Sequence, residues 1–390
     1  MKPVYITSDN IITSLGFTTA ENMESLNNHI SGLKMVDDPR LYPSPVILSL
    51  VATDLMENRF SGILAKFKKD TPATHFTRLE KLFILSISEA LSKTGTNPND
   101  PRTILVISTT KGNINLLEER YKAVFNHRRI FLWELGRIVA EFFGFRNAPV
   151  IISNACISGL VAIITAARMI QTGQFEHAVV AGGDIASEFV ISGFQSFQAL
   201  SPHPCKPFDK ERTGLSLGEG CGAMTLTSSP IASEEPSVIY AGGAITNDAN
   251  HISGPSRTGE ELSLAINRAL AKASVAPDEI DFISAHGTAT LYNDEMEAKA
   301  IGLSHLTPVQ VNSLKGYWGH TLGAAGLIES VAAIHSIRSG RIFRSEGYDQ
   351  PGVSVPLNII EHHESKPVNR CLKTASGFGG CNAAIVYQKL

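Results

Sequence analysis

Two segments of this 390-residue chain match each other without gaps at a constant offset of 167 residues, and this repeat restricts the fold most. Each segment has the pattern of a helix whose first turn holds small residues and which stops at a glycine. Because small faces let helices approach closely, we expect the two to meet at the centre of a fold made of two related halves. Chance similarity between two alanine-rich helices is the alternative. The matching pairs are Gly159 with Gly326, Leu160 with Leu327, Ala166 with Ala333, Ile170 with Ile337, and Gly173 with Gly340.

Short β-rich runs alternate with longer helical patterns along the chain, which predicts an α/β fold. A polar segment punctuated by prolines, Ser228 to Pro236, lies near the middle and suggests a boundary between two halves, residues 1–233 and 234–390. The expected strands are Ile104–Ser108, Val150–Ser153, His177–Ala181, Ile280–Ser284 and Ala384–Gln388, and the clearest expected helices are Arg78–Ser92 and Glu260–Ala273.

Composition excludes several classes of protein. Lys and Arg total 34 against 37 Asp and Glu, so the net charge of −3 provides no global basic field for nucleic acid. Five scattered cysteines without a CxxC pair fit neither a disulfide framework nor a structural zinc site. The first ten residues lack a signal-peptide pattern, and no apolar stretch has the length of a membrane span. We therefore expect a cytoplasmic protein with no membrane association.

Cys156 is the candidate nucleophile. It follows a buried strand pattern and precedes the first repeat helix, so we expect it at a helix N-terminus, where free amides and the helix dipole lower a thiol pKa. Without that placement, a free cysteine is more often a small buried apolar residue. Cys205, Cys221 and Cys371 are assigned to that second class.

Two histidines occupy comparable places at the ends of predicted elements. His286 comes just after the strand pattern that ends at Ser284, and His320 lies directly before the second repeat helix. Two histidines and one cysteine at such ends favour a shared catalytic cleft over separate structural roles. Neither histidine has the spacing of a metal site, so we expect no metal.

The glycine-rich turn Gly377-Phe378-Gly379-Gly380 precedes the last strand. Its backbone amides are candidates for an oxyanion hole, while Phe378 blocks or opens a cavity. A plain glycine turn is the alternative.

Taken together, these motifs resemble the β-ketoacyl-acyl carrier protein synthases of the elongating, Cys-His-His type, which share a thiolase-like, layered α/β/α/β/α fold of two pseudo-duplicated halves. The resemblance covers nearly the whole chain. It rests on Val4–Thr7 with Leu15-Gly16, Pro207–Arg212 with Leu217–Gly220, His286-Gly287-Thr288, Lys315 with Gly319-His320, and Gly377–Gly380.

The resemblance implies a role for each matching residue. Cys156 would take the acyl group, and His286 and His320 would hydrogen-bond the malonyl thioester carbonyl as carbon dioxide leaves. Lys315 and the buried Glu297 would hold the histidine cluster. The amides of Cys156 and Phe378 would form the oxyanion hole, and Phe378 and Phe194 would gate and line the acyl pocket. No redox cofactor is implied, since acyl transfer and carbanion attack need none.

The sequence also departs from the family pattern. Lys111 stands where the family usually has a small or apolar residue at the acyl pocket, and the segment between Tyr121 and Trp133 looks shortened. Ser376 replaces a bulky apolar residue, and Cys381 replaces the usual Thr or His. These changes favour a specialised polyene or polyketide-like substrate over ordinary long saturated fatty-acyl chains.

The partners implied are an acyl carrier protein bearing acyl and malonyl groups, and a second synthase subunit in a homodimer or heterodimer. Carrier proteins are acidic, so the cleft needs local positive charge. Two other assignments stay open: a non-catalytic subunit resembling a chain-length factor, which the presence of Cys156 disfavours, and a thiolase acting on coenzyme A esters, which Cys381 keeps possible. The candidate carrier-binding residues are Lys66, Lys68, Lys69, Arg78 and Lys81, and separately Arg128 and Arg129.

Overall fold

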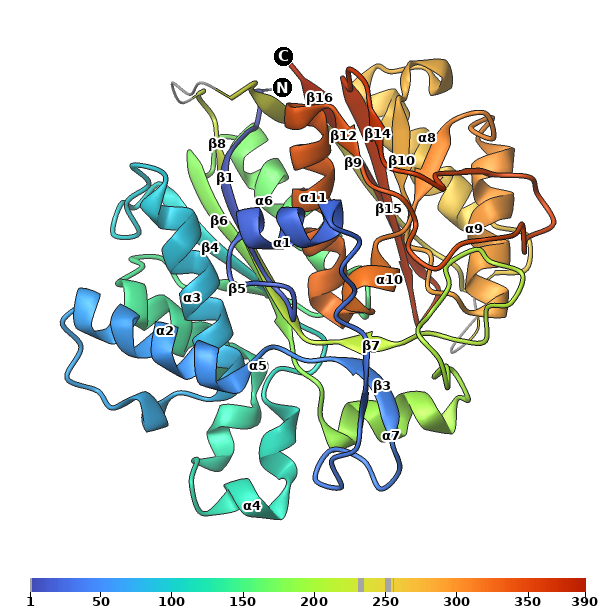
Figure 1. Ribbon diagram of the computed structural model, residues 1–390. Helices are drawn as coiled ribbons and strands as arrows, with labels where there is room; N and C mark the ends of the chain where they lie inside the picture. The colour runs from blue at the N-terminus through green and yellow to red at the C-terminus, as the bar shows by residue number, and fades with distance from the viewer. Residues whose placement is uncertain (1, 231–234, 250–253, 255) are drawn as a thin grey trace.

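The computed structural model describes residues 2–230, 235–249, 254 and 256–390, and its elements lie in five layers. Two helices, α6 (Ser158–Gln171) and α11 (Ala325–Ser339), form the middle layer between two halves of a β-sheet (Figure 1). The outer face of one half is covered by α3 (Arg78–Ser92), with α5 (Leu132–Phe143) beside it. On the other half, the helices α8 (Glu260–Ala273) and α9 (Leu291–Leu303) take this place. The predicted α/β/α/β/α layering is confirmed.

The sheet halves repeat the same pairing pattern. In each half two antiparallel pairs are followed by two parallel pairs, along β1-β8-β6-β4-β5 and along β9-β16-β15-β10-β11, with β13 added at the second edge. Within the described residues, the two sheet halves join where Tyr5 and Ile6 pair with Ile239 and Val238. The strands of the sheet are β1 (Tyr5–Ile12), β4 (Thr103–Ser108), β5 (Val150–Ile152), β6 (His177–Asp184), β8 (Gly220–Thr227), β9 (Val238–Asn247), β10 (Phe282–Ser284), β11 (Gln310–Asn312), β13 (Asn358–Ile359), β15 (Arg370–Gly377) and β16 (Cys381–Lys389).

The two central helices meet through their matching glycines. A Cβ on Gly159 would lie 2.7 Å from the Leu327 nitrogen, and a Cβ on Gly326 would lie 3.1 Å from the Leu160 nitrogen. Because both distances are shorter than a normal carbon contact, only glycine permits this approach. The repeat therefore predicts the helix contact at the centre of the fold correctly. The backbone after each helix turns at a glycine with positive φ, 77° at Gly173 and 70° at Gly340.

The strands and helices expected from the sequence are all present, and α3 and α8 have the predicted bounds. Further helices and strands complete the described part of the chain. They are α1 (Thr19–Asn27), β2 (Lys34–Val36), β3 (Val46–Ser49), α2 (Thr53–Lys66), α4 (Glu119–Lys122), α7 (Glu188–Ser196), β7 (Leu217–Gly218), α10 (Lys315–Trp318), β12 (Arg341–Ile342) and β14 (Glu364–Ser365).

The predicted boundary between residues 233 and 234 lies outside the described residues. Within the described part of the chain, no helix combines the length and apolar character needed to cross a bilayer.

Candidate active site

Cys156 lies at the tip of a tight turn between β5 and α6. The turn places Ala155 at φ 43°, a conformation that costs a non-glycine residue about 1–3 kcal/mol. Ser158 stabilises the turn, because its hydroxyl donates to the Ala155 carbonyl at 2.6 Å and accepts from the Asn154 amide at 2.8 Å. The predicted strand–turn–helix placement of Cys156 is thus present, and its side chain lines a cavity of about 270 Å³.

The structure brings Cys156, His286 and His320 together, although the cysteine and the histidines come from different halves. The Cys156 sulfur and one ring nitrogen of each histidine all lie within 4.8 Å of one another. The two imidazole rings meet edge to face, with their centroids 5.1 Å apart. All three side chains are buried and line the same cavity. The shared cleft predicted from the sequence therefore exists.

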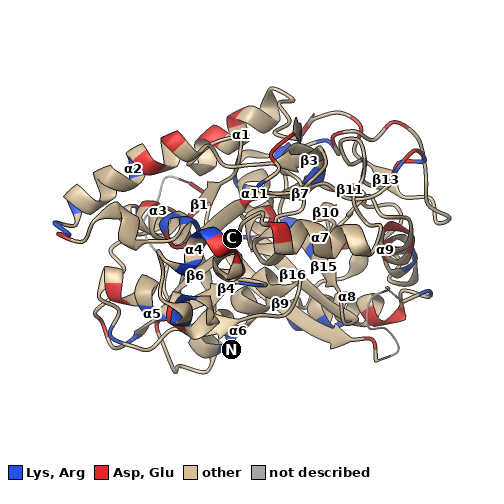
Figure 2. Cartoon of the chain, turned by 90° about the horizontal axis from the view of Figure 1, so that it is seen from below, with Lys and Arg blue, Asp and Glu red and all other residues tan. Residues whose placement is uncertain are grey.

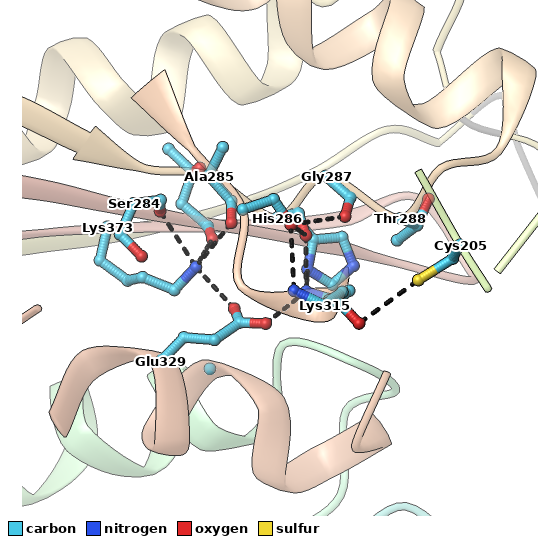
Figure 3. Close-up of polar contacts among 12 residues, drawn as sticks. Cys205, Ser284, Ala285, His286, Gly287, Thr288, Lys315, Glu329 and Lys373 are labelled. Carbon is cyan, nitrogen blue, oxygen red and sulfur yellow. Dashed lines mark hydrogen bonds and ion pairs between the residues drawn. The ribbon is translucent and has the colours of Figure 1, made fainter. Parts of the chain in front are cut away.

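Lys315, at the start of α10, fixes the orientation of His286. Its Nζ lies 2.5 Å from the His286 carbonyl oxygen and 3.3 Å from His286 Nδ1 (Figure 3). An ammonium group can only donate, so Nδ1 is the acceptor and the neutral ring carries its proton on Nε2. This assignment leaves an Nε2–H donor for a substrate.

The surroundings keep both histidines neutral. Burial lowers the pKa of His286 well below its ordinary value, and Lys315, His320 and Lys373 add to that shift. Burial also lowers the pKa of His320, with Lys315 and Lys373 again contributing. A neutral imidazole donates a hydrogen bond without bringing a charge that must be desolvated.

The thiol of Cys156 differs from expectation. Burial raises its pKa to about 12, and Cys381 adds to the increase, whereas the charges of Lys315 and Lys111 lower it only in part. Burial of the sulfur outweighs the lowering of the pKa that is expected at a helix N-terminus. The resting group is therefore a thiol that must give up its proton as it reacts.

Glu297 on α9 acts on the backbone of the histidine loop. It is fully buried and accepts from the amides of His286 at 2.8 Å and Gly287 at 2.7 Å. The Thr374 hydroxyl donates to the same carboxylate at 2.7 Å. Glu297 thus ties the loop after β10 to β15, which agrees with the organising role implied for it.

Two further buried charges belong to this cluster, and sequence reasoning missed both. Glu329 on α11 lies 2.5 Å from Lys315 Nζ and 2.7 Å from Lys373 Nζ on β15 (Figure 3). The repeat contained a signal for Glu329, because the aligned position in the first segment is Ala162. Lys373 could have been noticed as a charged residue in the middle of a strand pattern.

The glycine-rich turn lies against the nucleophile. A Cβ on Gly377 would be 2.9 Å from the Cys156 nitrogen, so the turn approaches as closely as glycine allows. This contact supports the predicted oxyanion hole from the amides of Cys156 and Phe378. The Phe378 ring lies 5.6 Å from that of Phe194, and 5.3 Å from that of Phe197, which the sequence did not single out. All three rings line the cavity.

Lys111 occupies an exposed turn after β4 and is not among the described residues that line the cavity. Its charge still lowers the pKa of Cys156, so it lies within electrostatic reach of the sulfur. Its assignment to the acyl pocket stays a prediction.

The expected carrier-binding residues differ in exposure and in their partners. Lys66 and Lys68 are exposed, but Arg78 forms an ion pair with Glu219 at 2.6 Å and Lys81 with Glu57 at 2.7 Å. In Figure 2, ribbon segments of Lys and Arg are interspersed with those of Asp and Glu along the chain.

Arg129 also has a structural partner. Its guanidinium is buried against the carboxylate of Glu80, with Nε 3.1 Å from Glu80 Oε1. Arg78, Lys81 and Arg129 thus each have an ion-pair partner within the chain, and their assignment to carrier binding stays a prediction. Lys69 and Arg128 remain on a surface groove of about 480 Å³ that lies over α5.

Comparison with known proteins identifies the family. The model of the "Beta-ketoacyl synthase, N-terminal domain" matches residues 1–231, and that of the "Beta-ketoacyl synthase, C-terminal domain" matches residues 238–349. The 3-oxoacyl-[acyl-carrier-protein] synthase 2 of Vibrio harveyi is 30% identical over 375 residues, covering 85% of this chain and 88% of the relative.

Two solved structures share the fold. The first is a ketosynthase, ApeO, in complex with its chain length factor, ApeC, from Xenorhabdus doucetiae, with a TM-score of 0.87, 23% identity and coverage of 100% of this chain and 98% of that one. The second is a type II polyketide synthase carrier protein in complex with its ketosynthase bound to the hexaketide, with a TM-score of 0.84, 23% identity and full coverage of both chains. With two family models matching in sequence order, the chain belongs to the beta-ketoacyl synthase family.

Proposed function

We propose that the chain is a β-ketoacyl-[acyl carrier protein] synthase, which joins an acyl group held on Cys156 to a two-carbon unit from malonyl-carrier protein. The observation that carries this proposal is the meeting of one thiol and two neutral histidines in a single buried cavity. A nucleophile and two hydrogen-bond donors are what a decarboxylative Claisen condensation requires.

In the first half-reaction the Cys156 sulfur attacks the carbonyl carbon of the acyl thioester. A new carbon–sulfur bond forms, the bond to the carrier thiol breaks, and the proton lost by Cys156 leaves with the carrier thiol. Because the resting group is a thiol, proton loss accompanies the attack. The amides of Cys156 and Phe378 are the proposed donors to the oxyanion.

In the second half-reaction the malonyl group loses carbon dioxide, and the electron pair of the broken bond forms an enolate. The negative charge gathers on the thioester oxygen, where the Nε2–H of His286 and a second donor from His320 would hold it. The enolate carbon then attacks the acyl carbonyl, and Cys156 leaves as a thiolate that regains a proton. The product is a β-ketoacyl-carrier two carbons longer.

The two alternatives have less support. Retention of Cys156 in a cavity argues against a purely non-catalytic subunit resembling a chain-length factor. The thiolase alternative would need Cys381 to face the substrate, but its sulfur is buried and lies 3.4 Å from the Phe378 carbonyl oxygen. Cys381 is also not among the described residues lining the cavity.

A second subunit is part of the proposal. The outermost strand of the first sheet half is β5, which leaves an edge open for pairing. Leu117, Phe131 and Trp133, which precede β5 in the chain, are exposed apolar residues. Such a surface suits a homodimer or heterodimer with a related synthase, and we place the enzyme in the cytoplasm with its carrier.

The carrier-binding surface leads to a prediction at two positions. Charge reversal of Lys69 and Arg128 together should lower kcat/KM for carrier-bound substrate by roughly 10-fold at low salt, because both cations lie on the groove over α5. Arg268→Glu, on an exposed position of α8 in the opposite outer layer, is the matched control. An equal loss in the control, or turnover unchanged in the double variant, would remove this groove from the proposal.

The acyl specificity can be tested by loading. Wild-type protein is incubated with a panel of acyl carrier proteins bearing saturated, unsaturated and aromatic acyl groups, and intact-protein mass spectrometry measures the adduct. We expect preferential loading of the specialised acyl groups, since Lys111 and Ser376 depart from the family pattern. Exclusive loading of long saturated chains would instead assign the enzyme to housekeeping fatty-acid synthesis. No covalent adduct with any carrier would contradict the proposed function itself.

A further inference from the structure

Lys373 is a fully buried lysine close to the active site, and the proposed mechanism does not use it. It lies on β15 directly opposite Ser284 of β10 in the register. Its Nζ donates to the carbonyl oxygens of Ser284 at 3.0 Å, Ala285 at 3.1 Å and Thr374 at 2.8 Å (Figure 3). The fourth contact is the ion pair with Glu329 at 2.7 Å. The ammonium group is therefore surrounded by oxygen.

Burying an ammonium group is costly unless its partners are well placed. Burial lowers the pKa of Lys373, and the charge of Glu329 opposes that shift. A Leu or Met would fill this space equally well if packing were the only requirement. The three carbonyl oxygens and the carboxylate around Nζ therefore indicate that the structure requires the charge of Lys373.

Glu329 links this lysine to the histidines. One carboxylate oxygen faces Lys315 and the other faces Lys373, so the carboxylate is held from two sides. Lys315 in turn contacts both the carbonyl oxygen and Nδ1 of His286. Lys373 also holds the carbonyls of Ser284 and Ala285, the two residues that precede His286. Two separate routes thus lead from Lys373 to the same imidazole.

We infer that Lys373 is a positioning residue for the condensation step: it holds Glu329 against Lys315 and ties the end of β10 to β15, so that His286 is fixed where the enolate forms. The inference rests on the role proposed above for His286. The charged and titratable groups around that ring are Lys315, Glu329, Lys373, Glu297, His320 and Cys156.

Lys373→Met tests the inference, because methionine keeps most of the volume and removes the charge and the donors. The acyl-loading rate at Cys156 should stay within about 3-fold of wild type. Condensation with malonyl-carrier should fall by about 10- to 100-fold, by analogy with the loss when an outer-shell partner of a metal-ligating histidine is removed.

The pH profile supplies a second readout that a purely structural role would not move. Lys373 is one of the charges that lower the pKa of His286 and His320, so its removal should raise both values. The acid limb of the condensation profile should then move to higher pH. Lys373→Arg keeps the charge and should return that limb toward the wild-type position. If Lys373→Met does not fold, Lys373→Gln carries the same test, since it keeps amide donors without charge.

Arg338→Met is the matched control. Arg338 lies in the last turn of α11, the same helix as Glu329, and its largely buried guanidinium pairs with Asp9 at 3.1 Å. This variant should lose thermal stability while keeping the wild-type ratio of the two half-reactions and the wild-type acid limb.

The outcomes separate the two proposals. The inference is wrong if wild-type protein loads acyl groups and condenses, but folded Lys373→Met keeps the wild-type ratio of acyl loading to condensation and the wild-type acid limb of the condensation pH profile. A parallel loss of both half-reactions, equal to that of the control, also contradicts it. If the wild-type protein itself neither loads nor decarboxylates, the proposed function fails instead.

Discussion

A Cys156→Ala variant should fold normally and lose acyl-enzyme formation and condensation altogether, with turnover reduced by at least about 10³-fold. In the proposed mechanism the sulfur is the atom that bonds to the acyl carbon, and alanine cannot replace it. Folding should survive because the side chain faces a cavity and the turn is held by Ser158 rather than by the thiol. Intact-protein mass spectrometry measures the adduct, and thermal unfolding measures the fold.

The other thiol of the site supplies the control. Cys381 lies beside the glycine turn and influences the Cys156 thiol, so Cys381→Ala removes a neighbouring sulfur by the same chemical change. This control should keep its adduct at Cys156. An adduct that persists in Cys156→Ala and disappears in Cys381→Ala would identify Cys381 as the nucleophile and contradict the proposed mechanism.

A His286→Ala variant should load its acyl group and then stall. Removal of one donor to a developing oxyanion costs about 10²- to 10³-fold in other enzymes, and the same loss is expected here in decarboxylation of malonyl-carrier. In the proposed mechanism acyl transfer depends on the sulfur and on the amides of Cys156 and Phe378, so the acyl-enzyme should accumulate. Single-turnover measurement of carbon dioxide release, beside mass spectrometry of the adduct, separates the two steps.

His335→Ala is the comparison for that variant. His335 is a partly buried histidine on α11 that pairs with Asp9 at 3.0 Å, outside the cavity. Its removal should leave both half-reactions unchanged. Loss of loading in His286→Ala, with the fold intact, would move this residue to the first half-reaction and require a different mechanism.

The internal repeat predicts the central contact because glycine is the only residue that permits it. Gly159 and Gly326 occupy matching places in the sequence and in the structure. Cys156, His286 and His320 were predictable for a related reason, since each follows or precedes a strongly patterned element whose end fixes its position.

The ion pairs were not predictable in the same way. Arg78, Lys81 and Arg129 look like surface cations in the sequence, but their partners are 141, 24 and 49 residues away. Hydrophobic periodicity predicts which face of a helix is buried. It does not predict that another element will place a carboxylate against that face. The same limit hid the ion pairs of Glu329 with Lys315 and Lys373. It also explains why burial of the Cys156 thiol could not be weighed against the helix dipole.

The contact between Gly159 and Gly326 also sets a reaction distance. Cys156 precedes α6 by two residues and His320 precedes α11 by five, so the spacing of these helices is transmitted directly to the sulfur and the imidazole. A displacement of 1 Å at a reacting centre can cost about 10²-fold in rate. The absence of a side chain at Gly159 and Gly326 therefore determines how close α6 and α11 come, and with it the distance between the reacting groups that precede them.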